Sequence, residues 1–205
     1  MPMSQPTAQL QKHYLDEDSL IQDSFRLAVH IFESGFRPTF IVGLWRGGSA
    51  VGIYVQECLQ TLGVKTDHIS VRTSYQGQAN YHQILQEPES IRVHGIQYLL
   101  ENLNVDDSLL IVDDVFSSGH NVEAVIKRLK SKLKLNMPRQ VKIATLWERP
   151  KFNQTSLKPD FCLHQTDQWL VFPYELTGLS LEEIQQHKGF VSPLIKPELA
   201  DKLRQ

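Results

Sequence analysis

The sequence predicts an α/β fold with a doubly wound, mainly parallel sheet, and three observations indicate it. Short apolar strand patterns alternate with helical patterns along most of the chain, which is typical of helices packed on both faces of a parallel sheet. The length of 205 residues suits one sizeable domain with a small appended part. Two polar, glycine-containing loops directly follow apolar strands, where such sheets bind their ligands.

Apolar spacing and turn residues assign the elements of the first half of the chain. Apolar residues recur at helical spacing over 21–32, and Gly35 follows as a C-terminal stop. After the break at Pro38, a short apolar strand covers 40–44. The elements expected next are a helix over 49–62 closed by Gly63, a strand over 66–73, a polar surface loop over 74–88, a strand over 91–94 and a helix over 96–103.

The second half continues the alternation of strands and helices. An apolar strand over 108–115 is followed by a helix over about 118–135, with buried positions at helical spacing. Further strands are expected over 141–146, 161–163 and 169–172, and the tail from about Thr177 contains one acidic helix start.

Composition and charge narrow the classes of partner. The chain carries 23 acidic and 21 basic residues, a formal net charge of −2, which gives no electrostatic footprint for nucleic acid or an anionic membrane. No apolar run approaches the ~20 residues of a membrane span, and the N-terminal segment lacks the apolar core of a signal peptide. Cys58 and Cys162 are expected to be reduced thiols, and the histidines show no metal-ligand spacing. We therefore expect a cytoplasmic protein that binds neither nucleic acid nor a membrane.

The segment Ser108–Asn121 carries the strongest functional pattern. Its apolar run ends in two adjacent acids, Asp113 and Asp114, and a hydroxyl-rich loop over 117–121 leads into the next predicted helix. The carboxylates can accept hydrogen bonds from neighbouring ribose hydroxyls, and loop amides at the positive end of a helix dipole can hold a terminal phosphate. Acids and serines at such a place can also merely cap a helix. The apolar strand before them and the Ser-Ser-Gly turn after them favour a sugar-phosphate site.

A second candidate loop follows the strand over 40–44. Arg46 supplies a fixed planar cation, and Gly47 and Gly48 allow the backbone to approach an anion closely. This combination suits a pyrophosphate group, whereas the spacing of a nucleoside triphosphate P-loop is missing. The simpler alternative is a tight turn that carries a surface arginine.

A third candidate segment, Asp167–Glu175, is aromatic. Trp169 can stack on a flat heterocycle, a contact that contributes roughly 1–3 kcal/mol in comparable sites, and backbone groups beside it can read the edge of the ring. Taken alone, the pattern more often belongs to a core aromatic residue of an edge strand.

The first two of these loops resemble the motifs of one family, the type I phosphoribosyltransferases. Its ribose-phosphate motif has an apolar strand, two acids, three residues ending in Thr, then Gly, any residue, and Thr or Ser; here Ser118 stands for the first Thr and Asn121 for the second. The Arg46 loop resembles the pyrophosphate loop of the family, where Arg or Lys precedes Gly-Gly. By this resemblance we expect a cis peptide bond at Arg46–Gly47.

Other segments resemble the 6-oxopurine branch, which comprises hypoxanthine and xanthine-guanine phosphoribosyltransferases. Trp169–Glu175 is similar to the strand whose Trp-aliphatic-x-x-Pro-aromatic-acid run closes the purine pocket, and Arg149 holds the position of a lysine that contacts the purine O6. Ser74 and Tyr75 resemble the Ser-Tyr pair of the flexible catalytic loop, which covers the substrates and excludes water. The order of segments matches the family over about 41–175.

The resemblance implies transfer of 5-phosphoribosyl from its 1-pyrophosphate (PRPP) to a ring nitrogen of hypoxanthine, guanine or xanthine. Mg²⁺ is the implied cofactor, held by pyrophosphate oxygens, ribose hydroxyls and waters. The implied site residues are, for catalysis, Asp113, Asp114, Ser117, Ser74 and Tyr75; for the 5′-phosphate, Ser117, Ser118, Gly119, His120 and Asn121; for pyrophosphate, Arg46, Gly47 and Gly48; for the base, Arg149, Trp169 and Leu170; and for the metal, largely indirectly, Asp113, Asp114 and Glu175.

One position departs from the 6-oxopurine pattern. Many members carry Asp directly before the first Thr of the phosphate loop, near purine N7, whereas this chain has Ser117. A serine hydroxyl can hydrogen-bond N7 but is a poor general base without a partner. We therefore expect Ser117 to contact the base, with water or a neighbouring group handling the proton, or with reduced activity.

Two alternatives to purine salvage stay open. One is a PRPP-binding regulator or sensor with little turnover, which Ser117 makes arguable. The other is a phosphoribosyltransferase for orotate, uracil or adenine, although those branches generally lack the Trp-aliphatic-x-x-Pro run. We expect one domain over 1–205, with a base-binding hood drawn from about 145–176 and a C-terminal extension from about 177. A homodimer or homotetramer is expected by resemblance alone.

Overall fold

The computed structural model describes residues 12–75 and 91–194 and divides into two compact units. The larger unit spans Ile21–Asp167, and the smaller one combines the described residues of Met1–Leu20 with those of Gln168–Gln205. None of the helices within the described stretches has the length and apolar character needed to cross a membrane. Both cysteines, Cys58 and Cys162, are free and half-buried.

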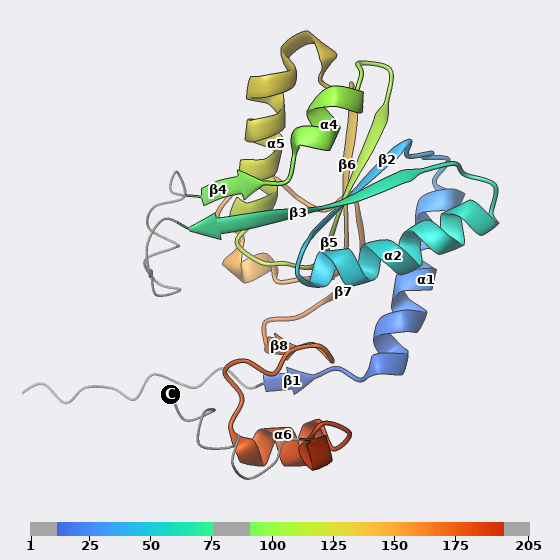
Figure 1. Cartoon of the computed structure of the whole chain (residues 1–205). Coiled ribbons are helices and arrows are strands. Elements are labelled where there is room, and N and C mark those ends of the chain that lie inside the picture. Colours follow the sequence, from blue (N-terminus) through green and yellow to red (C-terminus); the bar gives the residue numbers. More distant parts are fainter. Residues whose placement is uncertain (1–11, 76–90, 195–205) are drawn as a thin grey trace, which may run out of the picture. The chain divides into compact units, whose positions relative to one another are not determined.

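A six-stranded sheet forms the middle of the larger unit, with the strand order β4-β3-β2-β5-β6-β7 (Figure 1). Its strands are β2 (Phe40–Trp45), β3 (Asp67–Tyr75), β4 (Ile91–His94), β5 (Ser108–Phe116), β6 (Gln140–Glu148) and β7 (Phe161–Gln165). Neighbouring strands are parallel except for the antiparallel pair of β3 and β4. The predicted mainly parallel α/β sheet is therefore confirmed.

Helices cover both faces of this sheet, and α2 and α5 lie on opposite sides of it (Figure 1). The helices are α1 (Glu17–Glu33), α2 (Gly47–Thr61), α4 (Gln97–Asn102) and α5 (His120–Leu133), with short 3-10 turns η2 (Lys134–Asn136) and η3 (Pro150–Phe152). One core cluster joins strand residues such as Val42 and Ile111 to Leu99 of α4 and Val125 of α5. Strands buried on both faces explain why β2 and β5 are continuous apolar runs rather than alternating ones.

Glycines end two of the helices as the sequence predicts. Gly35 follows α1 and Gly63 follows α2, each with a positive φ (83° and 85°) that L-residues rarely adopt. The start of α2 differs from the prediction, since the helix begins at Gly47 rather than Ser49. Arg46 already has helical dihedrals (φ −102°, ψ −55°), so the glycine pair forms the first turn instead of a separate loop.

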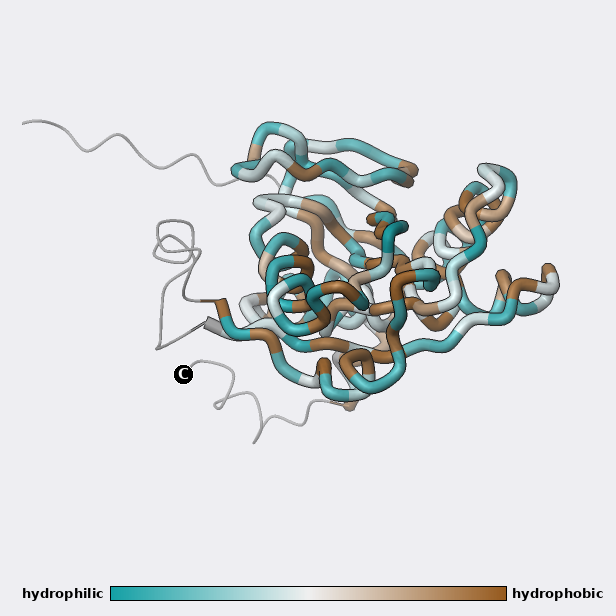
Figure 2. The backbone as a smooth tube through the Cα atoms, turned by 90° about the horizontal axis from the view of Figure 1, so that it is seen from above, coloured by the Kyte–Doolittle hydropathy of each residue, from teal (hydrophilic) through white to brown (hydrophobic). Residues whose placement is uncertain are grey.

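Hydrophobic and hydrophilic stretches alternate along the backbone tube in Figure 2. This alternation is expected when each helix or strand has a side that packs on the core and a side that does not. On α5, for example, Val122, Val125, Leu129 and Leu133 are buried, while the lysines of its last turn are exposed.

In its described residues, the smaller unit contains a two-stranded parallel sheet and helix α6. Strand β1 (Lys12–Tyr14) pairs with β8 (Trp169–Val171), and a 3-10 turn, η4 (Ser192–Leu194), ends the described part. Helix α6 (Leu181–His187) begins with a capping box in which Ser180 and Glu183 exchange hydrogen bonds. The sequence does not predict β1, because three residues are too few to show a period.

An ion pair, hydrogen bonds and a ring stack join the parts of this small unit. Glu183 accepts hydrogen bonds from Lys12 Nζ (2.5 Å) and from the Tyr14 hydroxyl (2.8 Å). The ring of Tyr14 also stacks on His187, with ring centroids 3.7 Å apart. Lys188 is almost fully buried, and its Nζ donates to Phe172 O at 2.7 Å, so its polar end is satisfied inside the unit.

Candidate active site

Two sequence-predicted loops of the larger unit meet at the carboxyl ends of β2 and β5. These strands are direct neighbours, with Gly43 opposite Val112. Gly48, in the first turn of α2, lies against β5: a Cβ atom on it would be 2.8 Å from Asp113 Cα and 3.1 Å from Asp113 Oδ1. The Arg46 loop and the acid pair therefore belong to one site, and only glycine fits at position 48.

Arg46 places a positive charge beside the start of α2. The described part of the chain holds no ion-pair partner for the exposed Arg46, and no side chain caps α2. Helix amides and a free guanidinium together suit an anionic group such as pyrophosphate. The cis peptide bond is at Trp45–Arg46, so the expectation of Arg46–Gly47 is wrong by one residue. The Arg46–Gly47 peptide leads directly into α2, and the peptides of a helix are trans.

His68 packs beneath this loop, a role that sequence reasoning missed. A Cβ atom on Gly43 would be 3.1 Å from His68 Nε2, and one on Gly52 would be 2.8 Å from it, so both glycines make room for the ring. His68 Nδ1 lies 3.3 Å from Gln56 Oε1. Burial lowers the pKa of His68, which favours the neutral ring. One histidine in a strand gives no sequence signal for such packing.

Asp113 and Asp114 are adjacent and directly follow the apolar part of β5. The Asp114 N–H donates to Asp113 Oδ1 (3.0 Å), and the Val115 N–H donates to Asp114 Oδ1 (2.8 Å). Burial, and then the negative charge of Asp114, raise the pKa of Asp113 well above its ordinary value. Hydroxyl donors or a cation placed here would compensate this charge.

The loop after Asp114 has the backbone geometry of an anion site. Gly119 has a φ of 80° and precedes α5, whose first amide, the His120 N–H, donates to Ser118 Oγ (3.4 Å). A Cβ atom on Gly119 would be 2.9 Å from Phe116 Cζ, so the loop turns tightly here. Amides of the loop and of the N-terminal turn of α5 are groups of the kind that hold a phosphate, and the role of 117–121 stays a prediction.

The segment after Pro150 braces this loop. The Gln154 N–H donates to Ser118 O (3.0 Å), and Gln154 Oε1 lies 2.9 Å from His120 Nε2. The His120 ring is thus buried and held at Nε2 by Gln154, whereas its Nδ1 has no hydrogen-bond partner among the described residues. Gln154 was not among the predicted residues; the polar run Asn153–Ser156 after a proline was the available signal.

Arg149, the residue directly after β6, lies at the same loop. Its N–H donates to Phe116 O (2.9 Å), which places the residue beside the end of β5. The side chain is only 4% exposed; Nη1 lies 3.5 Å from Ser117 Oγ, and Nη2 donates to Asp167 O at 3.4 Å. The guanidinium stacks over the Phe152 ring at 3.8 Å. The structure therefore joins Arg149 to Ser117, two residues far apart in the sequence.

Ser74 and Tyr75 lie in a strand, not in the surface loop predicted over 74–88. Strand β3 pairs with β2 as far as Arg72, which lies opposite Trp45. Beyond Arg72, antiparallel pairing with β4 continues the strand to Tyr75. Ser74 Oγ lies 2.8 Å from His94 Nε2 on β4. The rest of the predicted loop, 76–88, lies outside the described residues.

Two residues expected at the base lie in the smaller unit. Trp169 is 38% exposed and lines a cavity of about 1160 Å³ together with Tyr14 and Glu175. Leu170 is buried and is not among the lining residues, as expected from strand alternation. Glu175 Oε2 accepts a hydrogen bond from the Phe172 N–H (2.9 Å) and so stabilises the turn after β8.

Within residues 12–75 and 91–194, no three His, Cys, Asp or Glu side chains form a metal-binding group. A metal held at Asp113 and Asp114 would therefore need oxygen ligands from a bound substrate, which is the usual arrangement for Mg²⁺ with phosphates.

An Arg-Gly-Gly helix start, an acid pair and a phosphate-type loop at one edge of a mainly parallel sheet define a class of sugar-phosphate-binding α/β proteins. The family model for the phosphoribosyl transferase domain matches residues 11–177, and the chain belongs to this family. Enzymes of the family take PRPP and a base as substrates.

Solved structures support the fold. A purine phosphoribosyltransferase from Pyrococcus horikoshii Ot3 is 26% identical, with a TM-score of 0.60 over 83% of this chain and 98% of that one. A hypothetical protein from Neisseria gonorrhoeae with bound ppGpp is 19% identical (TM-score 0.64; 94% and 97% covered). A xanthine-guanine-hypoxanthine phosphoribosyltransferase from Helicobacter pylori is 17% identical (TM-score 0.60; 86% and 100% covered). No curated protein gives a significant match.

Proposed function

We propose that this phosphoribosyltransferase acts in purine salvage, transferring 5-phosphoribosyl from PRPP to hypoxanthine, guanine or xanthine and releasing pyrophosphate. The observation that carries this proposal is the buried Arg149 guanidinium beside Ser117. A fixed, planar donor next to the phosphate loop suits the carbonyl oxygen of a 6-oxopurine. The similarity to the Pyrococcus horikoshii purine phosphoribosyltransferase supports a purine as the acceptor.

The remaining residues then have distinct tasks around PRPP. Asp113 and Asp114 accept hydrogen bonds from the ribose hydroxyls, the 117–121 loop holds the 5′-phosphate, and Arg46, Gly47 and Gly48 hold the pyrophosphate. Breaking the bond at the anomeric carbon develops positive charge on the sugar and negative charge on the leaving group. Positioning and charge stabilisation are therefore the main catalytic contributions of the protein.

Mg²⁺ fits the donor set of this site. Asp113 and Asp114 offer hard oxygen atoms. Burial, and then the negative charge of Asp114, raise the pKa of Asp113, and a bound cation would counteract both effects. Bound Mg²⁺ would neutralise charge on the pyrophosphate. Glu175 is proposed as a further, indirect contributor, although one of its oxygens already accepts the Phe172 N–H.

We assign the base-binding hood to about 145–176 of a single domain, with Trp169 stacking on the purine and the backbone at Leu170 reading its edge. The exposed part of the Trp169 ring and its cavity support the stacking role. Ser74 and Tyr75 are proposed to cover the substrates during catalysis, and the protein is proposed to work in the cytoplasm as a homodimer or homotetramer.

The test is pyrophosphate release by the purified chain with PRPP and Mg²⁺, comparing hypoxanthine, guanine, xanthine, adenine, orotate and uracil. We expect turnover with at least one 6-oxopurine and little with the pyrimidines. Turnover only with adenine, orotate or uracil would contradict the proposal. PRPP binding without turnover on any base would favour a PRPP sensor, the second candidate, which the serine at position 117 supports.

A further inference from the structure

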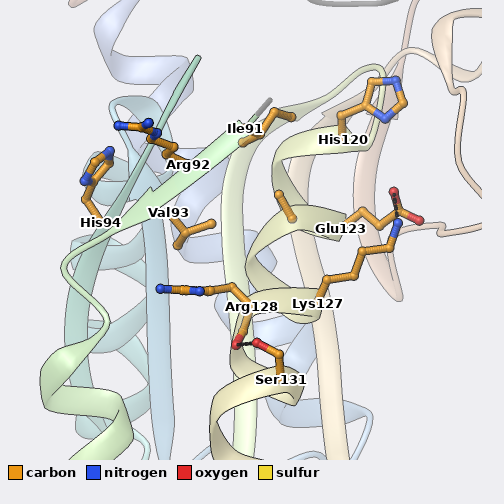
Figure 3. A pocket seen from close by; sticks show the side chains of 10 residues that line it. Ile91, Arg92, Val93, His94, His120, Glu123, Lys127, Arg128 and Ser131 are labelled. Atoms are coloured by element: carbon orange, nitrogen blue, oxygen red, sulfur yellow. Dashed lines mark hydrogen bonds and ion pairs between the residues drawn. The ribbon is translucent and has the colours of Figure 1, made fainter. Parts of the chain in front are cut away.

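A cavity of about 820 Å³ lies between β4 and one side of α5 in the larger unit (Figure 3). Residues of α5 that recur at helical spacing, from His120 to Ser131, form one wall, and Ile91–His94 of β4 form the other. Small-molecule sites typically occupy about 300–1,000 Å³, so the space is sufficient for a ligand of nucleotide size.

The charges that line this cavity are mostly positive. Arg92, Lys127 and Arg128 contribute permanent cations, whereas Glu123 is the single carboxylate of the lining. That carboxylate is already paired, since Lys127 Nζ lies 3.0 Å from Glu123 Oε2. The whole chain carries a net charge of −2, so the positive charge of this lining is opposite in sign to the net charge of the chain.

Arg128 is the group best placed to hold an anion. Its side chain extends from α5 toward β4 in Figure 3. Across the described ranges, no carboxylate pairs with Arg128. An arginine fork binds phosphate oxygens in a bidentate way, which a lysine cannot reproduce. Ile91, Val93 and Ala124 add an apolar part to the wall, suited to the sugar or ring of a phosphorylated molecule.

Both walls of the cavity connect to the proposed active site. His120, which lines the cavity, is the first residue of α5 and belongs to the proposed 5′-phosphate loop. His94, on the other wall, contacts Ser74 Oγ through its Nε2 at 2.8 Å. A ligand that bridges β4 and α5 would thus fix the paired strands β3 and β4, which carry Ser74 and His94, relative to the phosphate loop.

The geometry points to a second, regulatory site: the cavity between β4 and α5 binds a polyphosphate-bearing small molecule, such as a nucleoside triphosphate, and its occupation changes the affinity for PRPP. The change in PRPP affinity rests on the proposed function, whereas the anion binding itself does not. The shared chemistry of the ligand is a row of phosphates, which either an inorganic polyphosphate or a nucleotide supplies.

The binding test uses calorimetric titration of the full chain with inorganic tripolyphosphate and, separately, with ATP. Arg128→Ala is expected to weaken the binding of both probes at least about tenfold, and Arg128→Lys by less, because one charge-assisted contact is lost or loosened. Lys132→Ala removes an exposed cation of the same helix that does not line the cavity, and it should change the affinity less than about twofold. Tighter binding of ATP than of tripolyphosphate would identify a nucleotide as the ligand; equal binding would identify the phosphates alone.

Arg46→Ala tests whether the two probes bind in this cavity or at the pyrophosphate loop. The expected result is that Arg46→Ala retains the Arg128-dependent binding of tripolyphosphate. The proposal is overturned if Arg128→Ala binds both probes as the wild type does, or if only Arg46→Ala loses binding. It is also overturned if a single-stranded RNA binds in an Arg128-dependent way while neither small probe does.

The regulatory role of the cavity is tested by measuring the dissociation constant of PRPP with and without saturating ATP. We expect at least a threefold change in the wild type and none in Arg128→Ala, in the range typical of couplings between sites. An unchanged PRPP affinity in the wild type would overturn the regulatory role. A chain without turnover on any base would refute the proposed function but leave both binding measurements valid.

Discussion

Gly48 lies directly against Asp113, so closely that a Cβ atom on Gly48 would come within 2.8 Å of Asp113 Cα. The helix start that presents Arg46 is therefore in contact with the strand that presents the acid pair. In the proposed enzyme, the groups that hold pyrophosphate and those that hold ribose keep a fixed spacing because no side chain separates them.

Gly48→Ala is expected to push the first turn of α2 away from β5. Overpacking of this kind costs about 1–3 kcal/mol, so the affinity for PRPP should fall at least about tenfold. Gly189→Ala is the control, since a Cβ atom there meets its nearest neighbour at 3.9 Å. PRPP titration and the thermal midpoint are measured together; PRPP binding equal to that of Gly189→Ala would contradict the prediction.

Asp113→Asn is expected to stabilise the ligand-free protein while weakening PRPP binding. Because the pKa of Asp113 is raised in the folded chain, the fold favours the protonated carboxyl. The stability that the protonated carboxyl contributes is fully present below the unfolded pKa and is lost as pH rises through the folded pKa. Near neutral pH, Asp113→Asn should therefore be more stable than the wild type by on the order of 1–3 kcal/mol. This difference in the free energy of unfolding should disappear toward about pH 4. Urea unfolding across this range tests it, with the exposed Asp106→Asn as the charge-matched control. A gap that is constant with pH would contradict the assignment.

Arg149→Met is expected to raise the KM for a 6-oxopurine at least about tenfold, because a buried charged donor to the base is lost. Lys151→Met removes a neighbouring cation that is 76% exposed and pairs with Asp167 at the surface. Steady-state kinetics should separate the two variants, with PRPP affinity retained in both. Equal KM values for the base would argue against Arg149 as a base contact.

Ser117→Asp is expected to change turnover or the ranking of the bases. The new carboxylate would lie beside the Arg149 guanidinium, whose Nη1 is 3.5 Å from Ser117 Oγ, and would alter the charge that faces the base. A change of at least about threefold in relative kcat/KM is expected. The exposed Ser156→Asp serves as the control; unchanged kinetics for every base would refute contact between Ser117 and the base.

Glu183→Gln is expected to remove a pH-dependent part of the stability of the smaller unit. Hydrogen bonds from Lys12, then from the Ser180 backbone and Tyr14, lower the pKa of Glu183 to about 2. A lowered carboxyl pKa stabilises the fold above the unfolded value, ordinarily 4.5, and this stability is lost as pH falls toward about 2.

At neutral pH the loss in Glu183→Gln should be about 1 kcal/mol, since the contact is partly exposed to solvent. Glu182→Gln, on the same helix, controls for the charge. Thermal unfolding at pH values from about 2 to about 7 should show the wild type and Glu183→Gln converging at the acid end. Parallel curves over the whole range would contradict the role of this cluster.

Local sequence patterns were sufficient for most of the fold. The apolar runs of β2 and β5, the helical spacing in α1 and α5, and the stops at Gly35 and Gly63 each depend on neighbours within a few residues. Such features are visible in one dimension because strand and helix periods, turns and caps are set by local geometry. The sequence likewise predicted that the Arg46 loop and the acid pair share one edge of the sheet.

Tertiary structure alone decided the features that depend on pairing between distant segments. Antiparallel pairing with β4 keeps Ser74 and Tyr75 in a strand, the cis bond is at Trp45–Arg46 because α2 begins at Gly47, and packing of His68 accounts for Gly52. The contact of Arg149 with Ser117 depends on the register of β5 and β6. Register and packing are set by residues far apart in the chain, so no local sequence pattern predicts them. The periodicity of a helix or strand, in contrast, depends only on the residues of that element and is therefore visible in the sequence.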